Sequence, residues 1–327
     1  RYRRSSGRRP NARRTLLFMV LLAFGVSLLI WRTAPPSRIA DITPATPLAS
    51  APRTTRTPRP APVETPTPPE ATGLARLLGP AIDQLIARYQ LQGIDRIGLV
   101  IEDGRETDTI ERNADDRFMA ASLYKLFVLW RTQVEIRQGK LFDTTELTLT
   151  AQNDDSDEDG YSLGAYGDTV SVADLRRLMI VASSNTAAQM LGQYFGWGTI
   201  DQLVRSHGFT ATIVSGQAST TARDVTRFFD GVINQTLDPL LTADDYALML
   251  GLLKDQEVNT KLSTGFPDGT IFAHKTGDLT GVHHDAGIIF LPDGRMVTIT
   301  VMIAGDYDAS VQFSHDLAAL LWQSLAA

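Results

Sequence analysis

The chain has 327 residues, of which 43% are hydrophobic and 21% charged, enough apolar material for a full-sized folded core. It contains no cysteine, which excludes thiol catalysis, disulfide bonds and cysteine-ligated metals. Residues 1–72 hold 12 of the 31 basic and 3 of the 37 acidic side chains, which leaves 19 basic against 34 acidic, a net charge of −15, in residues 73–327. Because nucleic-acid phosphates need a basic face, we expect no nucleic-acid partner.

The N-terminal segment is basic and then apolar. Residues 1–14 carry seven arginines and no acid, and an uncharged stretch follows as far as Trp31. As a helix, this stretch would span roughly 25 Å, slightly less than a hydrocarbon core of about 30 Å. Because arginine clusters stay cytoplasmic, we expect a cytoplasmic basic tail over 1–14, a transmembrane signal anchor over 15–32, and an extracytoplasmic remainder at the cell surface or in the periplasm. A cleaved signal peptide is the alternative.

Residues 33–72 have the composition of a linker. Eleven of the sixteen prolines lie there, with many threonines and few aliphatic clusters. Such a segment buries too little apolar surface to order itself. We therefore expect a disordered Pro/Thr-rich linker that holds a folded domain, residues 73–327, away from the membrane.

The folded domain begins with an apolar pattern of helical period over residues 74–89. Two strands follow at 97–102 and 107–111, separated by the turn signal Asp103-Gly104. A helix is predicted over 119–137. Three further helices begin where a serine or threonine precedes an acid by three residues, the pattern of a capping box; these residues are Ser171, Thr221 and Thr242.

The C-terminal part returns to strands, which are predicted over 270–276, 282–291 and 296–304, before a last helix over 311–325. Two strands at the start and three at the end can form one sheet if the chain ends meet. We therefore predict an α+β fold, with a five-stranded antiparallel sheet flanked by helices and a helical subdomain formed by the central segment. We expect a monomer.

Ser122 and Lys125 form the first candidate catalytic motif, at the start of the helix that follows the predicted hairpin. A spacing of three places both side chains on one helix face, so that the amine can accept the hydroxyl proton. The positive end of the helix favours an alkoxide at Ser122. Because a Ser-x-x-Lys pattern arises often by chance, this motif needs the support of others.

The second motif is Ser183-Ser184-Asn185, which follows the helix that Ser171 begins. The hydroxyl of Ser183 can carry a proton to a leaving amine, and the amide of Asn185 can hold a substrate amide. Taken alone, the same three residues are also typical of a simple helix junction, with Asn185 as the cap.

The third motif, Lys275-Thr276-Gly277, ends a predicted strand. Lys275 can supply positive charge for a substrate carboxylate, Thr276 a hydroxyl donor, and Gly277 room for a substrate backbone. The backbone N–H groups of Asp278 and Ser122 can together form an oxyanion hole. Of the three motifs, this one is the least expected by chance.

Together, the three motifs resemble the signature of class A β-lactamases and penicillin-binding proteins. They occur in the family's order, and residues 179–188 and 274–278 are similar to that family beyond the motif positions. The resemblance covers residues 73–327 and implies a β-lactamase/transpeptidase-like fold with an acyl-enzyme on Ser122. Ser184 stands where the family has aspartate, at a position that is structural in the family.

One part of the class A pattern is missing. Class A enzymes carry a loop, Arg-x-Glu-x-x-Leu-Asn, whose glutamate activates the water that clears the acyl-enzyme. Between Asn185 and Lys275 the only glutamate is Glu257, and residues 208–221 contain no acid. Acylation without efficient deacylation is typical of a penicillin-binding protein.

The sequence thus predicts a β-lactamase-like serine hydrolase that forms an acyl-enzyme with β-lactam or D-Ala-D-Ala-like substrates. A penicillin-binding D-alanyl-D-alanine carboxypeptidase or related cell-wall enzyme is one alternative. A non-catalytic cell-wall-binding domain is another, although the complete set of serines and lysines argues against it. No cofactor is expected.

Several other residues are candidates for minor roles. The acidic run 154–159 before Gly160 resembles half of a calcium loop but lacks the final glutamate, so a solvated loop is the preferred interpretation. Tyr161 and Tyr166 can wall the cleft and bind substrate, or pack as ordinary aromatics. His283 and His284 are adjacent on a strand, where side chains alternate between faces, so we expect no metal site.

Overall fold

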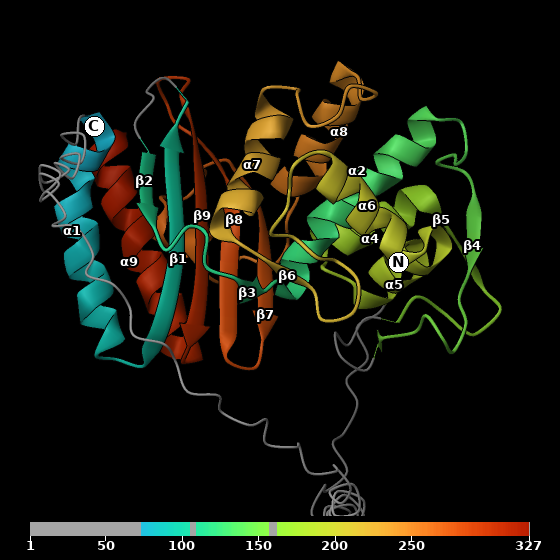
Figure 1. Ribbon diagram of the computed structural model, residues 1–327, viewed down its shortest axis with the longest axis horizontal. Helices are drawn as coiled ribbons and strands as arrows, with labels where there is room; N and C mark the ends of the chain where they lie inside the picture. Colours follow the sequence, from blue (N-terminus) through green and yellow to red (C-terminus); the bar gives the residue numbers. More distant parts are fainter. Residues whose placement is uncertain (1–72, 105–108, 157–161, 327) are drawn as a thin grey trace, which may run out of the picture. The chain divides into compact units, whose positions relative to one another are not determined.

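The computed structural model describes residues 73–104, 109–156 and 162–326 (Figure 1). The basic tail, signal anchor and linker expected over 1–72 lie outside these residues. None of the helices in the described part of the chain combines the length and the apolar character needed to cross a membrane.

A five-stranded antiparallel sheet forms the centre of the domain, in the order β2-β1-β9-β8-β7. The predicted α+β arrangement is confirmed, because the first long strand pairs with the last one, from Ile94 opposite Gly305 to Asp103 opposite Val297. The edge strand β7 lies beside the helical subdomain (Figure 1). The strands are β1 (Ile94–Asp103), β2 (Thr109–Arg112), β7 (Phe272–Leu279), β8 (Val282–Phe290) and β9 (Met296–Gly305).

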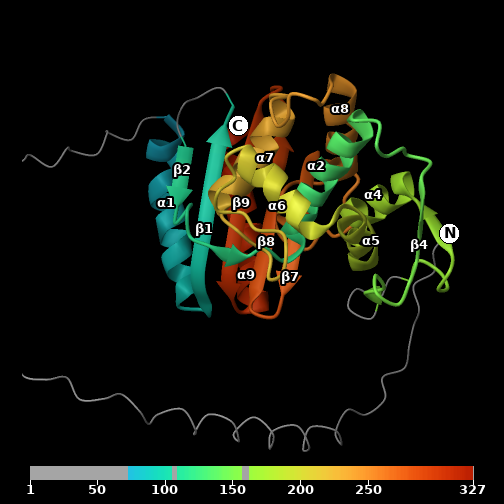
Figure 2. The same ribbon diagram turned by 45° about the vertical axis from the view of Figure 1, so that its right-hand side comes forward.

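Both faces of the sheet are covered. Helices α1 (Gly73–Gln90) and α9 (Tyr307–Leu325) pack on one face, and the remaining helices lie on the other (Figures 1 and 2). Strand β1 shows the alternation clearly, since Leu99 joins the core under α1 and α9 while Val100 joins the core of the helical side. A strand buried on both faces needs a continuous apolar run, which β1 has.

The helical subdomain surrounds α2 (Tyr124–Arg137), most of whose residues are buried, including Lys125. The short 3-10 turn η1 (Ala121–Leu123) precedes α2, and a second turn, η2 (Leu262–Gly265), precedes β7. The other elements are β3 (Phe118–Met119), β4 (Glu146–Thr148), β5 (Thr169–Ser171), α4 (Val172–Val181), α5 (Asn185–Phe195), α6 (Trp197–Ser206), β6 (Ser219–Thr220), α7 (Ala222–Ile233) and α8 (Ala243–Lys254).

The three predicted capping residues begin helices as expected. The hydroxyl groups of Ser171 and Thr221 each accept the backbone N–H three residues on, and Thr242 forms a reciprocal capping box with Asp245. Each cap satisfies backbone N–H groups that the first helical turn leaves without a partner, a contribution of about 1 kcal/mol. These contacts set where α4, α7 and α8 begin.

Two element boundaries differ from those predicted. The helix expected from residue 119 starts instead with η1, and its regular turns begin at Tyr124. Strand β7, expected to end at Thr276, continues to Leu279 because its last residues pair with the start of β8 across a tight turn. This extension keeps Gly277 and Asp278 in the sheet, beside the nucleophile motif.

Candidate active site

Ser122 lies in η1, directly before α2, and Lys125 follows one turn later. Lys125 is completely buried, and its Nζ lies 3.0 Å from Ser122 Oγ. Ala121, just before Ser122, has a φ of +44°, a left-handed conformation that is strained for a residue with a Cβ atom. Strain of this kind persists only where the surrounding structure imposes it, and here it marks the turn that presents Ser122.

The amine of Lys125 is surrounded by oxygen atoms. Its Nζ lies 2.6 Å from Asn185 Oδ1, 2.5 Å from the backbone oxygen of Ser183 and 3.3 Å from Ser183 Oγ. The carbonyl and amide oxygens are acceptors only, so each takes an N–H from the amine. A neutral amine then has its lone pair left for the hydroxyl hydrogen of Ser122, which is the arrangement a general base requires.

The second motif forms the junction between α4 and α5. Ser183 has a φ of +59°, and this turn directs its side chain to both lysines of the site. Ser184, rather than Asn185, caps α5, since its Oγ accepts the N–H of Ala187 at 3.2 Å. The amide of Asn185 does not cap the helix and instead accepts a hydrogen bond from Lys125. Ser184 has the structural role of capping α5.

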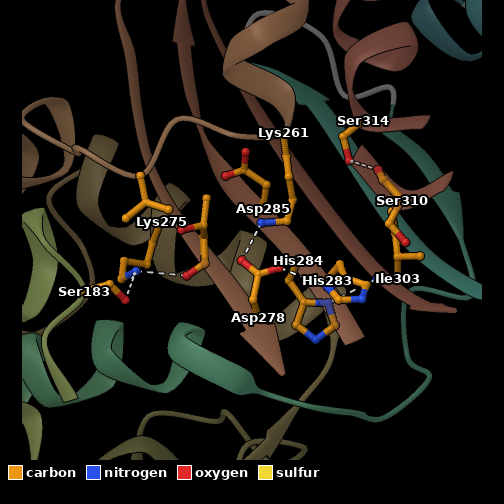
Figure 3. A network of polar contacts seen from close by, with 12 residues as sticks. Ser183, Lys261, Lys275, Asp278, His283, His284, Asp285, Ile303, Ser310 and Ser314 are labelled. Atoms are coloured by element: carbon orange, nitrogen blue, oxygen red, sulfur yellow. Dashed lines mark hydrogen bonds and ion pairs between the residues drawn. The ribbon is translucent and has the colours of Figure 1, made fainter. Parts of the chain in front are cut away.

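Lys275 comes from the edge strand β7 and is also completely buried. Its Nζ lies 2.9 Å from Ser183 Oγ and donates to the backbone oxygen of Thr276 at 2.9 Å (Figure 3). Burial, and then the positive charges of Lys125 and Lys261, hold the pKa of Lys275 well below its usual value. Ser183 Oγ therefore lies within hydrogen-bond reach of two amines from distant segments.

Gly277 lies where β7 approaches the nucleophile. A Cβ atom at this position would sit 3.2 Å from the backbone nitrogen of Ser122 and 3.2 Å from the backbone oxygen of Ala120. That is closer than most side chains tolerate, so only glycine permits this approach without a shift of the backbone. Asp278 follows Gly277 directly and lines the same cleft as Ser122, and the N–H groups of these two residues are predicted to form the oxyanion hole.

A cleft of about 560 Å³ opens at Ser122. Asn185 and Gln189 contribute amide groups to its wall, and Trp197 stacks edge-on against Tyr124 with ring centroids 6.0 Å apart. Aromatic and apolar walls with few polar groups are typical of small-molecule sites. The described residues that line the cleft are Met119, Ala121, Ser122, Tyr124, Asp155, Asn185, Gln189, Trp197, Val214, Gly216, Gln217, Ala218, Asp278 and Leu279.

Comparison with known proteins assigns the family. A model of the β-lactamase enzyme family matches residues 78–325. The chain belongs to this family. β-Lactamase VEB-1 of Pseudomonas aeruginosa is 22% identical over 253 residues, which are 69% of this chain and 84% of that protein. The extended-spectrum β-lactamase PER-1 of Pseudomonas aeruginosa is 24% identical over 235 residues, which are 65% of this chain and 76% of that protein.

Solved structures of the β-lactamase family have the same fold. The L158E mutant of PBP-A, an acyl-enzyme complex with penicillin G, aligns with a TM-score of 0.69 at 21% identity, covering 78% of this chain and 98% of the other. An ancestral class A β-lactamase aligns with a TM-score of 0.66 at 20% identity, covering 75% of this chain and all of the other. At these identities, the likeness establishes the fold.

The segment between the second and third motifs lacks the class A glutamate. Among the cleft-lining residues that the structure describes, the acids are Asp155 and Asp278, and none is a glutamate. Glu257, the glutamate of this stretch, is exposed and follows α8. Asp201 accepts the N–H groups of Val214 and Ser215 and so holds the short turn that stands at the cleft.

Sequence reasoning missed a buried ion pair beside the third motif. Lys261, which has no exposed surface, lies with its Nζ 2.6 Å from Asp278 Oδ2, and His283 Nδ1 lies 3.0 Å from Asp278 Oδ1 (Figure 3). Asp278 had been expected to act through its backbone alone. No local pattern marks Lys261, because its burial results from the packing of the segment before η2 on the sheet.

His284 supports the backbone before Ser122. Burial lowers its pKa to about 4, so the ring is neutral at neutral pH. Nδ1 accepts the N–H of Ile303 at 3.1 Å, which leaves the proton on Nε2 to bind the backbone oxygen of Met119 at 2.8 Å. His283 contacts Asp278 instead, so the two rings lie on opposite faces of β8, as the alternation predicts.

His274, next to Lys275, makes a second buried polar contact with an acidic side chain. Its Nδ1 lies 2.8 Å from Asp285 Oδ1, and its Nε2 lies 2.9 Å from Asn259 Oδ1. The Asn259 amide donates to the backbone oxygen of Gln256, which fixes Oδ1 as the atom that faces the ring. Both ring nitrogens of His274 therefore face oxygen atoms, and these contacts fix the orientation of the ring beside Lys275.

Of the minor candidates, Tyr166 does not line the described cleft. Tyr166 is exposed, with its hydroxyl donating to Asp154 Oδ2 at 3.0 Å, and it is not among the residues that line the cleft. Its side chain is 64% exposed, and the hydrogen bond to Asp154 holds the ring at the surface of the loop. Tyr161 and residues 157–159 of the acidic run lie outside the described residues, which contain no cluster of three metal-binding side chains.

Proposed function

We propose that the protein is a serine hydrolase that forms an acyl-enzyme on Ser122 with a β-lactam or a D-Ala-D-Ala-like substrate. The observation that carries the proposal is the contact of 3.0 Å between Lys125 Nζ and Ser122 Oγ, with Asn185 and Ser183 accepting the two N–H groups of a neutral amine. This geometry supports Lys125 as the general base that takes the hydroxyl proton.

In the acylation step, Ser122 Oγ attacks the substrate carbonyl, and the N–H groups of Ser122 and Asp278 stabilise the negative oxygen that develops. The leaving amine takes a proton from the hydroxyl group of Ser183. One of the two lysines that contact Ser183 Oγ then reprotonates this oxygen. Lys275 and Thr276 hold the substrate carboxylate, and Asn185 holds the amide of the acyl group. Lys275 gains a proton more easily once a carboxylate binds, because the anion offsets the charge of Lys261 and Lys125.

A penicillin-binding D-alanyl-D-alanine carboxypeptidase is the second candidate. It is favoured by the described cleft, which contains no glutamate to activate the deacylating water. A carboxylate that activates water contributes about a hundredfold or more to a hydrolytic step. Acylation by a β-lactam would then be fast relative to release.

The experiment incubates the full chain with a fluorescent penicillin and measures both covalent labelling and the hydrolysis of nitrocefin. Stable labelling without hydrolysis supports the carboxypeptidase, and rapid hydrolysis supports a β-lactamase. The Ser122→Ala variant must lose both signals, whereas Ser206→Ala, on the exposed end of α6, must keep them. Labelling that survives in Ser122→Ala would overturn the proposal, and no labelling at all would favour a non-catalytic cell-wall-binding domain.

We further propose that residues 15–32 anchor the domain outside the cytoplasmic membrane. The seven arginines of residues 1–14 support this orientation. Protease added to intact spheroplasts should remove the catalytic domain and leave the N-terminal tail protected. Protection of the whole chain would contradict this orientation.

A further inference from the structure

The charged side chains on the cleft wall are acids. Among the described lining residues, Asp155 and Asp278 are the only ones with a formal charge at neutral pH, while Lys125 and Lys275 are completely buried behind the wall. A substrate that enters the cleft therefore meets negative charge first. Like charges at close range reduce affinity, and the reduction is largest where the local dielectric is low.

Asp278 is held in place by a buried cation. Its side chain is 38% exposed, whereas that of Lys261 is 0% exposed. Within the part of the chain that the structure describes, Asp278 is the hydrogen-bonding partner of Lys261 Nζ. A buried ammonium group without a counter-charge has a large energetic cost. The ion pair therefore keeps the Asp278 carboxylate beside Lys261.

The Asp278 carboxylate lies on the face of β7 that the proposed function assigns to the substrate carboxylate. Side chains alternate along a strand, so Thr276 and Asp278 lie on the same face, two residues apart. The proposed function assigns Thr276 to the carboxylate of the substrate. Asp278 is therefore placed beside that group, and it already pairs with the ammonium group of Lys261.

We propose that Asp278 is a specificity-determining residue, whose side-chain carboxylate makes the cleft discriminate against substrates that carry a carboxylate beside the scissile bond. This inference rests on the proposed acyl-enzyme function of Ser122. Lys275 and Thr276 still hold a substrate carboxylate, but the charge of Asp278 shifts the preference toward substrates with a neutral or cationic group at that position. Penicillins still react, but more slowly than the catalytic groups alone would permit.

The test compares benzylpenicillin with its methyl ester, which differs only in lacking the negative charge. Mass spectrometry of the full chain gives the rate constant of Ser122 acylation for each compound, and the quantity of interest is the ratio of acid to ester. Asp278→Asn should raise this ratio about tenfold, which corresponds to about 1.4 kcal/mol. Lys261→Met should lower it, because no ammonium group then offsets the negative charge of Asp278.

The ratio is measured within one preparation, so a partly misfolded variant does not alter it. Asp268→Asn, on the exposed loop before β7, makes the same change in net charge away from the cleft and should leave the ratio unchanged. The inference is overturned if Asp278→Asn leaves the ratio unchanged or if Asp268→Asn raises it equally. If neither compound acylates Ser122 in the unmodified protein or in Asp278→Asn, the proposed function fails, and this inference fails with it.

Discussion

Lys125 and Lys275 are 150 residues apart in the chain, yet both amines lie within hydrogen-bond reach of Ser183 Oγ, at 3.3 Å and 2.9 Å. One lysine comes from the central helix α2 and the other from the edge strand β7. Two buried amines at such close range cannot both remain protonated without a large electrostatic cost. A proton shared through a serine hydroxyl is the arrangement that this geometry favours.

Ser183→Ala should slow the acylation of Ser122 by benzylpenicillin about a hundredfold, because the leaving amine loses its proton donor. The acylation rate constant, measured by mass spectrometry, checks this prediction. Its neighbour provides the matched control: Ser184→Ala removes a helix cap and should cost about 1 kcal/mol in the free energy of unfolding without changing acylation per folded molecule. Equal losses of acylation in both variants would count against a role of Ser183 in proton transfer.

Gln217→Glu should shorten the lifetime of the acyl-enzyme about tenfold or more, because it places a carboxylate in the wall of the cleft near Ser122. The decay of the fluorescent penicillin adduct after removal of free label measures the lifetime. Gln202→Glu, on the exposed face of α6, makes the same substitution outside the cleft, and a similar effect there would refute the assignment.

His284→Leu should slow acylation about tenfold, because the backbone oxygen of Met119 loses its hydrogen bond and the turn before Ser122 loosens. His284→Gln can still donate to Met119 and should recover most of the rate. Since burial lowers the pKa of His284 to about 4, this contact should not change between pH 5 and pH 8. A nitrogen NMR spectrum in which the His284 ring titrates near pH 6.5 would contradict the assignment.

Glu102→Gln should stabilise the domain in mildly alkaline solution. Burial and then the neighbouring Asp230 carboxylate raise the pKa of Glu102 from 4.5 to about 8. Between these values the folded state binds a proton that the unfolded state releases, so the free energy of unfolding falls as the pH rises through this window. The side-chain amide introduced by Glu102→Gln can still donate a hydrogen bond to Asp230, and it does not titrate.

The expected gain at pH 8 is about 1–2 kcal/mol, a figure reduced for solvent screening because Glu102 is only about half buried. Below pH 4.5 the difference between the variant and the unmodified protein should vanish. Urea unfolding at both pH values measures it. The substitution Glu146→Gln on the exposed strand β4 is the control, and the same pH dependence in that variant would argue against the Glu102–Asp230 pair.

The order of elements and the local motifs were readable from the amino-acid sequence. The caps at Ser171, Thr221 and Thr242, the strand periodicity and the turn-apart spacing of Ser122 and Lys125 all depend on residues within a few positions of each other. Local hydrogen bonds and side-chain periodicity act over such distances in any tertiary context.

The roles of Lys261, His274, His284 and the Asp278 side chain were decided only by the tertiary structure. Each depends on which residues face each other across β7 and β8 and on which segment packs over them. The pairing register and the packing of distant segments are set by the burial of the whole core, so no local pattern carries that information. For the same reason, the sequence identified the lysine of the third motif but not the buried charges that surround it.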